Sequence, residues 1–152
     1  MFEADIQDVF LKLYLEYKTE AYVEYQRIES DYEKNAMDPS KALSVDFSIY
    51  ARDWFRLNKQ AKKKCAEVKE ICDYRSKQGF NEKIDKSLFC IWLAYMRLEA
   101  YTMKMSGIAS RLDIKAHGGE YTLDEYVKEL TEAEKDKQAL EEIHREAFQL
   151  NQ

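Results

Sequence analysis

The sequence predicts an all-α protein, an elongated antiparallel bundle of four long helices within one domain that spans residues 1–152. The first observation is that helix breakers are rare, because 152 residues contain only four Gly and one Pro. The second is their position: they lie mainly at Asp38-Pro39, at Gly79 and at Gly118-Gly119, and so divide the chain into four segments of similar length. The third is that apolar residues within each segment recur at steps of three or four, the period of an amphipathic helix.

The first helix is predicted over about residues 3–36. Its apolar row contains Ile6, Phe10, Tyr14, Tyr17, Ala21, Tyr25, Ile28 and Tyr32. A shorter strip of Leu11, Leu15 and Tyr22 flanks this row, so we expect the helix to contact two neighbours.

The second helix is predicted over about residues 39–78, with Asp38 as its cap and Pro39 in its first turn. Gly79 is expected to end it in a left-handed conformation. Its apolar stripe alternates almost strictly between steps of three and four, which favours shallow helix crossings of about 20°. The stripe contains Leu43, Phe47, Tyr50, Trp54, Leu57, Ala61, Cys65, Val68 and Cys72.

The third helix, about residues 82–115, differs because residues 88–98 are apolar on nearly every side. Gly107 lies inside this helix and predicts a kink or a close crossing there. The fourth helix, about residues 123–149, starts after a capping box formed by Thr122 and Glu125. Its apolar stripe is thin, so we expect it to be the least firmly docked helix.

Charge is sorted by segment. Residues 1–38 and 120–152 each carry ten acidic and four basic side chains, whereas residues 39–80 carry ten basic and five acidic ones. Opposite charges would meet if the first helix lay beside the second and the fourth beside the third. Exposed ion pairs of this kind contribute only tenths of a kcal/mol each, roughly.

A basic face of the second helix is the first candidate binding surface. It lies away from the Trp54 stripe and contains Arg52, Phe55, Arg56, Lys59, Lys62 and Lys63. Three interpretations remain open: a face that is solvated or paired within the chain, a site for an acidic protein, and a site for nucleic acid. The acidic net charge of −5 argues against nucleic acid, whose phosphates dominate its affinity for proteins.

An apolar row on the third helix is the second candidate. Residues 88–98 carry more apolar surface than one core stripe needs, and Phe89, Trp92, Met96 and Met103 share one strip. Either other parts of this chain cover that strip or a second molecule does. Trp, Phe and Met are enriched at the centres of protein interfaces, so a partner or a second copy of this chain is one of these two open interpretations of the strip.

Motifs for catalysis are missing from the sequence. Glu141-x-x-His144 matches half of a di-iron bundle motif, but His117, the other histidine, has no Glu three positions before it. We interpret His144 as a polar residue on a weakly apolar face that contacts an acidic neighbour. Three Cys without paired spacing predict reduced thiols rather than zinc or disulfides, although Cys72 and Cys90 would lie at equal height in a hairpin.

These observations predict a non-catalytic protein that binds other proteins: an adaptor, an assembly factor or a protein inhibitor, with self-association as one form. The alternative is a nucleic-acid or polyanion binder that uses the basic face. No cofactor, metal or small-molecule substrate is indicated. We expect a cytoplasmic protein without a membrane segment, because the start is acidic and the longest apolar run, residues 88–96, is half of a membrane span.

Overall fold

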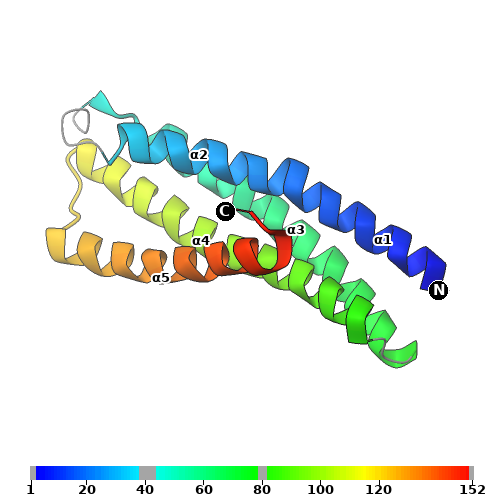
Figure 1. Ribbon diagram of the computed structural model, residues 1–152. Coiled ribbons are helices and arrows are strands. Elements are labelled where there is room, and N and C mark those ends of the chain that lie inside the picture. The colour runs from blue at the N-terminus through cyan, green and yellow to red at the C-terminus, as the bar shows by residue number, and fades with distance from the viewer. Residues whose placement is uncertain (1–2, 38–43, 79–81, 151–152) are drawn as a thin grey trace.

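The protein is an elongated bundle of helices in its computed structural model, which describes residues 3–37, 44–78 and 82–150 (Figure 1). These residues contain no strand, so the predicted all-α bundle is confirmed. The elements are α1 (Glu3–Glu16), the π-helix η1 (Tyr17–Ala21), α2 (Tyr22–Asn35), α3 (Phe47–Gln78), α4 (Glu82–Ala116) and α5 (Leu123–Phe148).

The helices run side by side in an antiparallel arrangement. α1, η1 and α2 form one continuous rod; α3 returns along it, α4 runs beside α3, and α5 packs on α4 (Figure 1). With 26 residues against 35, α5 is shorter than α4, and it ends about midway along the bundle. Phe148, the last residue of α5, lies beside Cys90 of α4. The part of α4 between Glu82 and Cys90 therefore extends beyond the end of α5.

Buried side chains from every helix form one connected core. Each helix contributes residues at the spacing of its own apolar stripe, and the fully buried members include Ile6, Tyr17, Trp54, Leu57, Leu88, Leu98, Leu140 and Phe148. α3 follows its predicted stripe closely, because Tyr50, Trp54, Leu57, Ala61, Cys65 and Val68 are all buried. Periodicity therefore identifies the core-facing side of α3 correctly.

The first rod departs from the predicted row at its centre. In η1 the backbone N–H of Tyr22 bonds to the carbonyl of Tyr17, five residues earlier, so this turn holds one residue more than an α-turn. As a result Tyr22, which is 7% exposed, follows Tyr17 into the core, while Ala21 is only half-buried. The predicted step from Tyr17 to Ala21 was wrong for this reason.

The second predicted helix starts later than expected. Residues 45–46 are not helical, and α3 begins at Phe47. The Asp46 carboxylate accepts hydrogen bonds from the Ser48 backbone N–H at 3.0 Å and from its hydroxyl at 2.5 Å, which is the pattern of a helix cap. The predicted cap at Asp38, the start at Pro39 and the stop at Gly79 lie outside the described residues.

α4 continues through Gly107 without a break in helix, and a Cβ there would lie 3.2 Å from the Arg111 guanidinium. The helix ends in a Schellman motif: the N–H of Gly119 bonds to the Ile114 carbonyl at 2.8 Å, and Gly118 has φ of 94°. Only glycine adopts this left-handed conformation readily, which explains the residue type at 118.

α5 begins as predicted, because the Thr122 hydroxyl accepts a hydrogen bond from the Glu125 backbone N–H at 3.1 Å. The expected apolar stripe holds less well at its start, since Leu123 is 74% exposed. Nearer the end, α5 buries Ala133, Leu140, Ile143, His144 and Phe148. Ile143 was missing from the predicted stripe, which consisted of Leu123, Tyr126, Leu130, Ala133, Leu140, Ala147 and Phe148.

Ion pairs join the helices that the charge pattern placed side by side. Lys64 of α3 lies 3.0 Å from Glu16 of α1, and Lys104 of α4 lies 2.6 Å from Asp136 of α5. Among the described residues, none of the helices combines the length and apolar character that a membrane span requires.

Candidate functional site

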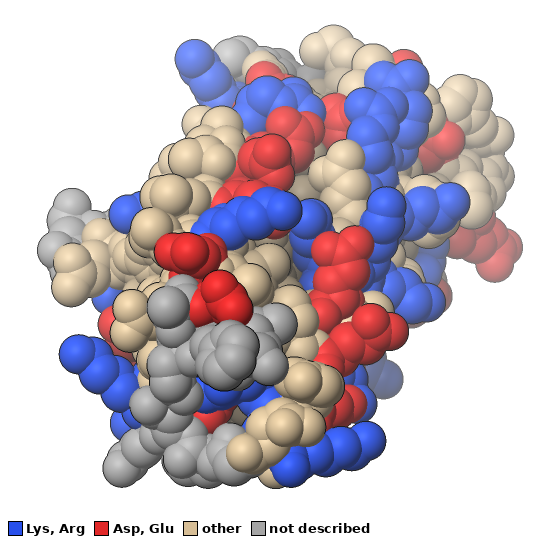
Figure 2. All heavy atoms as spheres, turned by 90° about the vertical axis from the view of Figure 1, so that its right-hand side faces the viewer, with Lys and Arg blue, Asp and Glu red and all other residues tan. Residues whose placement is uncertain are grey.

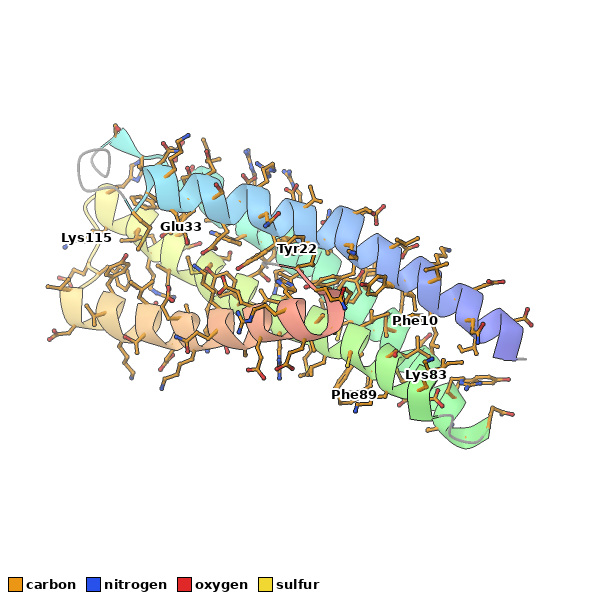
Figure 3. All side chains as sticks on the ribbon, in the orientation of Figure 1. Phe10, Tyr22, Glu33, Lys83, Phe89 and Lys115 are labelled. Atoms are coloured by element: carbon orange, nitrogen blue, oxygen red, sulfur yellow. The ribbon has the colours of Figure 1, made fainter. Side chains whose placement is uncertain are left out.

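The apolar row on α4 faces outward. Phe89, Met96 and Met103 are 50%, 38% and 53% exposed, and Trp92 is partly buried with its ring 5.2 Å from that of Phe89. Figure 3 shows Phe89 projecting from α4 on the side away from α1. Within the described chain, these side chains therefore keep much of their apolar surface in contact with solvent.

The row is exposed because a different side of α4 fills the core. Leu88, Ile91, Ala94, Tyr95 and Leu98 are buried between α3, α5 and the first rod. The excess of apolar residues predicted for 88–98 is thus divided into a covered side and an uncovered side. We call Phe89, Trp92, Met96 and Met103 the outer apolar row.

The basic face of α3 is exposed, but the structure divides it into two parts. Phe55 is 46% exposed and carries the Lys59 ammonium 4.7 Å from its ring centroid, while Lys62 is exposed on the same side of the helix. Arg56 and Lys63 instead line a groove towards α2. Figure 2 shows lysine and arginine side chains gathered along one side of the molecule, next to acidic ones.

Arg52 completes the predicted set and is also exposed. Its Nε lies 3.9 Å from the Asp53 carboxylate, a distance that gives a weak surface pair. The six predicted residues of this face therefore do not form one site. Arg56 and Lys63 line the groove that also contains Glu20 of η1 and Glu24 of α2, whereas Phe55, Lys59 and Lys62 lie outside that groove and Arg52 lies next to Asp53.

One part of the basic face adjoins the outer apolar row. Asn58 donates a hydrogen bond to the Glu99 carbonyl of α4 at 2.8 Å, and the Cys65 thiol lies 4.0 Å from the Trp92 carbonyl. Lys62 follows Asn58 by four residues and precedes Cys65 by three, which places it on the same side of α3. Lys62 therefore lies on the side of α3 that adjoins α4 and its outer apolar row, while Lys59, three residues earlier, contacts Phe55.

A buried polar pair lies at the centre of the bundle. The Tyr17 hydroxyl and His144 Nε2 are 2.5 Å apart, and both side chains are fully buried. Burial lowers the pKa of His144 to about 4 and raises the pKa of Tyr17 well above its usual value, so both groups are neutral at pH 7. The expected acidic contact of His144 is wrong, because a tyrosine fills that position.

Aromatic rings enclose this pair. The rings of Tyr22 and Tyr25 lie 4.9 and 5.6 Å from the His144 ring, and Phe148 stacks on Tyr17 at 4.6 Å. His144 Nδ1 and the Tyr25 hydroxyl are buried without a hydrogen-bond partner among the described residues. The only trace of this arrangement in the sequence is the five-residue step between Tyr17 and Tyr22.

A second polar cluster joins α2, α4 and α5. Lys137 lies 2.9 Å from Glu29 and 2.8 Å from Glu33, and Glu29 also accepts a hydrogen bond from Tyr101 at 2.6 Å. Burial alone would lower the pKa of Lys137, but the bonds to Glu33 and Glu29 raise it above its usual value. This cluster fastens the side of α5 that faces α2.

The cysteines carry free thiols. Cys65 is buried, and Cys72 and Cys90 are partly buried. Burial, with help from the Asp73 and Asp85 carboxylates, raises the pKa of Cys72 to about 11. A thiol with so high a pKa is a poor nucleophile at neutral pH.

The described part of the chain has no group of three or more His, Cys, Asp or Glu side chains placed to hold an ion. Comparison with known protein families, with curated proteins and with solved structures finds no match. Function is therefore inferred from the residues of this chain.

Proposed function

We propose that this is a non-catalytic cytoplasmic protein, an adaptor, assembly factor or inhibitor, that binds another protein through the outer surface of α3 and α4. The observation that carries the proposal is the outer apolar row, in which Phe89, Met96 and Met103 are each more than a third exposed. Exposed apolar side chains grouped on one side of a helix are a recurring feature of protein interaction sites.

The positive charge beside the outer apolar row indicates which chemistry a partner would need. Lys62 of α3 lies on the side of that helix next to the apolar surface, Lys59 lies three residues before it, and neither makes an ion pair with a described residue. An amphipathic helix with acidic side chains flanking its apolar stripe would meet both features, since it offers carboxylates to the lysines and apolar groups to the row. We therefore propose an acidic amphipathic helix as the partner element.

Matched variants test this proposal. Phe89→Ser/Met96→Ser/Met103→Ser removes the row, and Leu11→Ser/Leu15→Ser removes two side chains of similar exposure, 53% and 48%, on the far face of α1. Host proteins captured by photo-crosslinking at position 96 would be identified and purified. The proposal requires that a purified partner contains an acidic helix. This partner should bind the wild type and the α1 variant with equal affinity, and should bind the row variant at least tenfold more weakly.

Two results would contradict it. One is equal binding of the partner to both variants, and the other is a partner contact that maps to a basic or non-helical segment. Sedimentation of the purified protein separates self-association from partner binding, because a dimer that the row variant abolishes would make a second copy the occupant.

Binding of nucleic acid or another polyanion is the alternative function. Its support is the exposed pairing of Lys59 with Phe55, since a base can stack on an aromatic ring that a cation flanks. Its weakness is that Arg56 and Lys63 face Glu20 and Glu24 across the groove. Gel-shift assays at low salt decide between the two functions. A nucleic-acid shift that appears at micromolar wild-type protein and is lost in Lys59→Gln/Lys62→Gln favours the alternative.

A further inference from the structure

A groove lies where η1 and the start of α2 pass α3. Its volume is about 620 Å³, within the range of small-molecule sites in proteins. The floor contains Ala21, Leu57 and Ala61, and the two alanines leave the space that larger side chains would fill. The wall formed by η1 is the π-helix, a local irregularity that is frequent at functional sites.

Tyr95 provides a polar group at the bottom of the groove. Its side chain is 2% exposed, lines the groove and packs edge-on against Tyr17, with ring centroids 4.9 Å apart. No hydrogen bond joins its hydroxyl to a described residue, and this hydroxyl is not one of the fully enclosed polar atoms that lack a partner. Burial and the nearby Glu16, Glu20 and Glu67 carboxylates raise the pKa of Tyr95, so the hydroxyl keeps its proton and can donate it to a ligand.

The two walls carry opposite charges. On the α3 side, Lys64 is paired with Glu16 at 3.0 Å and with Glu67 at 3.4 Å, but Arg56 and Lys63 have no ion pair with a described residue. On the facing wall, Glu24 is held by Arg27, whereas Glu20 has no such partner. Two cations therefore face one unpaired carboxylate across an apolar floor.

We propose that this groove binds a small zwitterion of the peptide type. The carboxylate of the ligand would lie between Arg56 and Lys63, its ammonium group would face Glu20, and its apolar part would cover Ala21 and Ala61 beside the Tyr95 hydroxyl. A simple anion would meet Glu20 and Glu67, and a simple cation would meet Arg56 and Lys63, so only a molecule with both charges satisfies both walls.

The test uses the dipeptide Leu-Leu as the probe, with N-acetyl-Leu-Leu and Leu-Leu amide as forms that each lack one charge. Titration is followed by ¹⁵N–¹H NMR at pH 7 and low salt. We expect the free dipeptide to shift the amide signals of Ala21, Ala61 and Tyr95, and each blocked form to bind about tenfold more weakly, as loss of a charge-assisted hydrogen bond implies.

Substitutions in the groove test which side chains contact the dipeptide. Arg56→Gln/Lys63→Gln should weaken binding of the free dipeptide at least tenfold, and Tyr95→Phe, which keeps the ring, roughly threefold to tenfold. The matched control is Lys59→Gln/Lys62→Gln on the other side of α3, which should bind as the wild type does.

Several outcomes would overturn the zwitterion site. They are no binding up to the solubility limit of the dipeptide, equal binding of a blocked form, or signal changes that map elsewhere. The inference does not depend on the outer apolar row, because the row variant leaves the groove intact. Failure of one proposal is thus distinguishable from failure of the other.

Discussion

The Tyr17 hydroxyl and His144 Nε2 share a 2.5 Å hydrogen bond in the centre of the bundle, although 127 residues separate them in the chain. This bond joins the π-helix of the first rod to the last turns of α5. It is one of the few polar contacts that tie α5 to a helix other than α4, and it is sealed from water by Tyr22, Tyr25 and Phe148.

Tyr17→Phe is expected to lower the free energy of unfolding by about 1–3 kcal/mol, because it leaves His144 Nε2 buried without a partner. Urea denaturation monitored by circular dichroism measures the change. Tyr14→Phe serves as the control, since no hydrogen bond of the Tyr14 hydroxyl is found among the described residues, and it should change stability by less than about 0.5 kcal/mol. Equal effects of the two substitutions would contradict a structural role for the buried bond.

The stability of the protein should fall between pH 6.5 and pH 4 because of His144. Its pKa is lowered to about 4 in the folded protein, so the unfolded chain binds a proton first as the pH decreases. The stabilisation is complete above pH 6.5 and is lost towards pH 4, by roughly 3 kcal/mol in total. In His144→Phe, the free energy of unfolding measured by urea titration should depend less on pH between 6.5 and 4. A pH dependence equal to that of the wild type would refute the assignment to His144.

Lys137→Met is expected to destabilise the fold by about 1–3 kcal/mol, because the Glu29 carboxylate, 12% exposed, loses its cation. The Glu33 pair, with a carboxylate that is 55% exposed, should contribute well under 1 kcal/mol, roughly. A double-mutant cycle with Glu29→Gln and Glu33→Gln separates the two couplings. Lys135→Met, exposed on the same helix, is the control, and a larger coupling to Glu33 than to Glu29 would contradict this ranking.

Two glycines of the α4 region should respond oppositely to replacement by Ala. Gly118→Ala should destabilise by about 1 kcal/mol, because a Cβ is strained at its φ of 94°. Gly107→Ala should be neutral or stabilising by up to about 1 kcal/mol, since the added methyl lies 3.2 Å from the end of the Arg111 side chain, which can shift slightly and keep its pair with Glu129. Thermal unfolding of both variants checks the signs, and a destabilised Gly107→Ala would indicate a close contact there.

Helical periodicity predicted much of this fold. The stripe of α3, the Thr122 cap and the Gly118 stop follow from residue spacing and local chemistry, which act within a few residues. The start of α3 at Phe47 was not predicted, since Asp46 and Asp38 are equally suited to cap a helix and pattern alone does not rank them.

The arrangement of the candidate surfaces was predicted only where it depends on one helix. The outer apolar row shares one side of α4, so spacing alone predicted that its residues lie together. The buried pair and the groove each require two helices in register, and that register depends on η1. Ala21 fits regular helical spacing and therefore masked the five-residue step from Tyr17 to Tyr22, which was the one sign of a wider turn at this position.

The wider turn of η1 also has a consequence for the length of the chain. Loss of one residue between Tyr17 and Tyr22 would restore regular α-helix, and Tyr22 would then follow Tyr17 at an α-helical step of four residues, on the same face. Tyr25, Ile28 and Tyr32 would therefore remain in the interior together. A single-codon deletion in this stretch should leave the bundle intact, whereas a deletion elsewhere in the rod would turn one part of its buried face away from the core by about 100°.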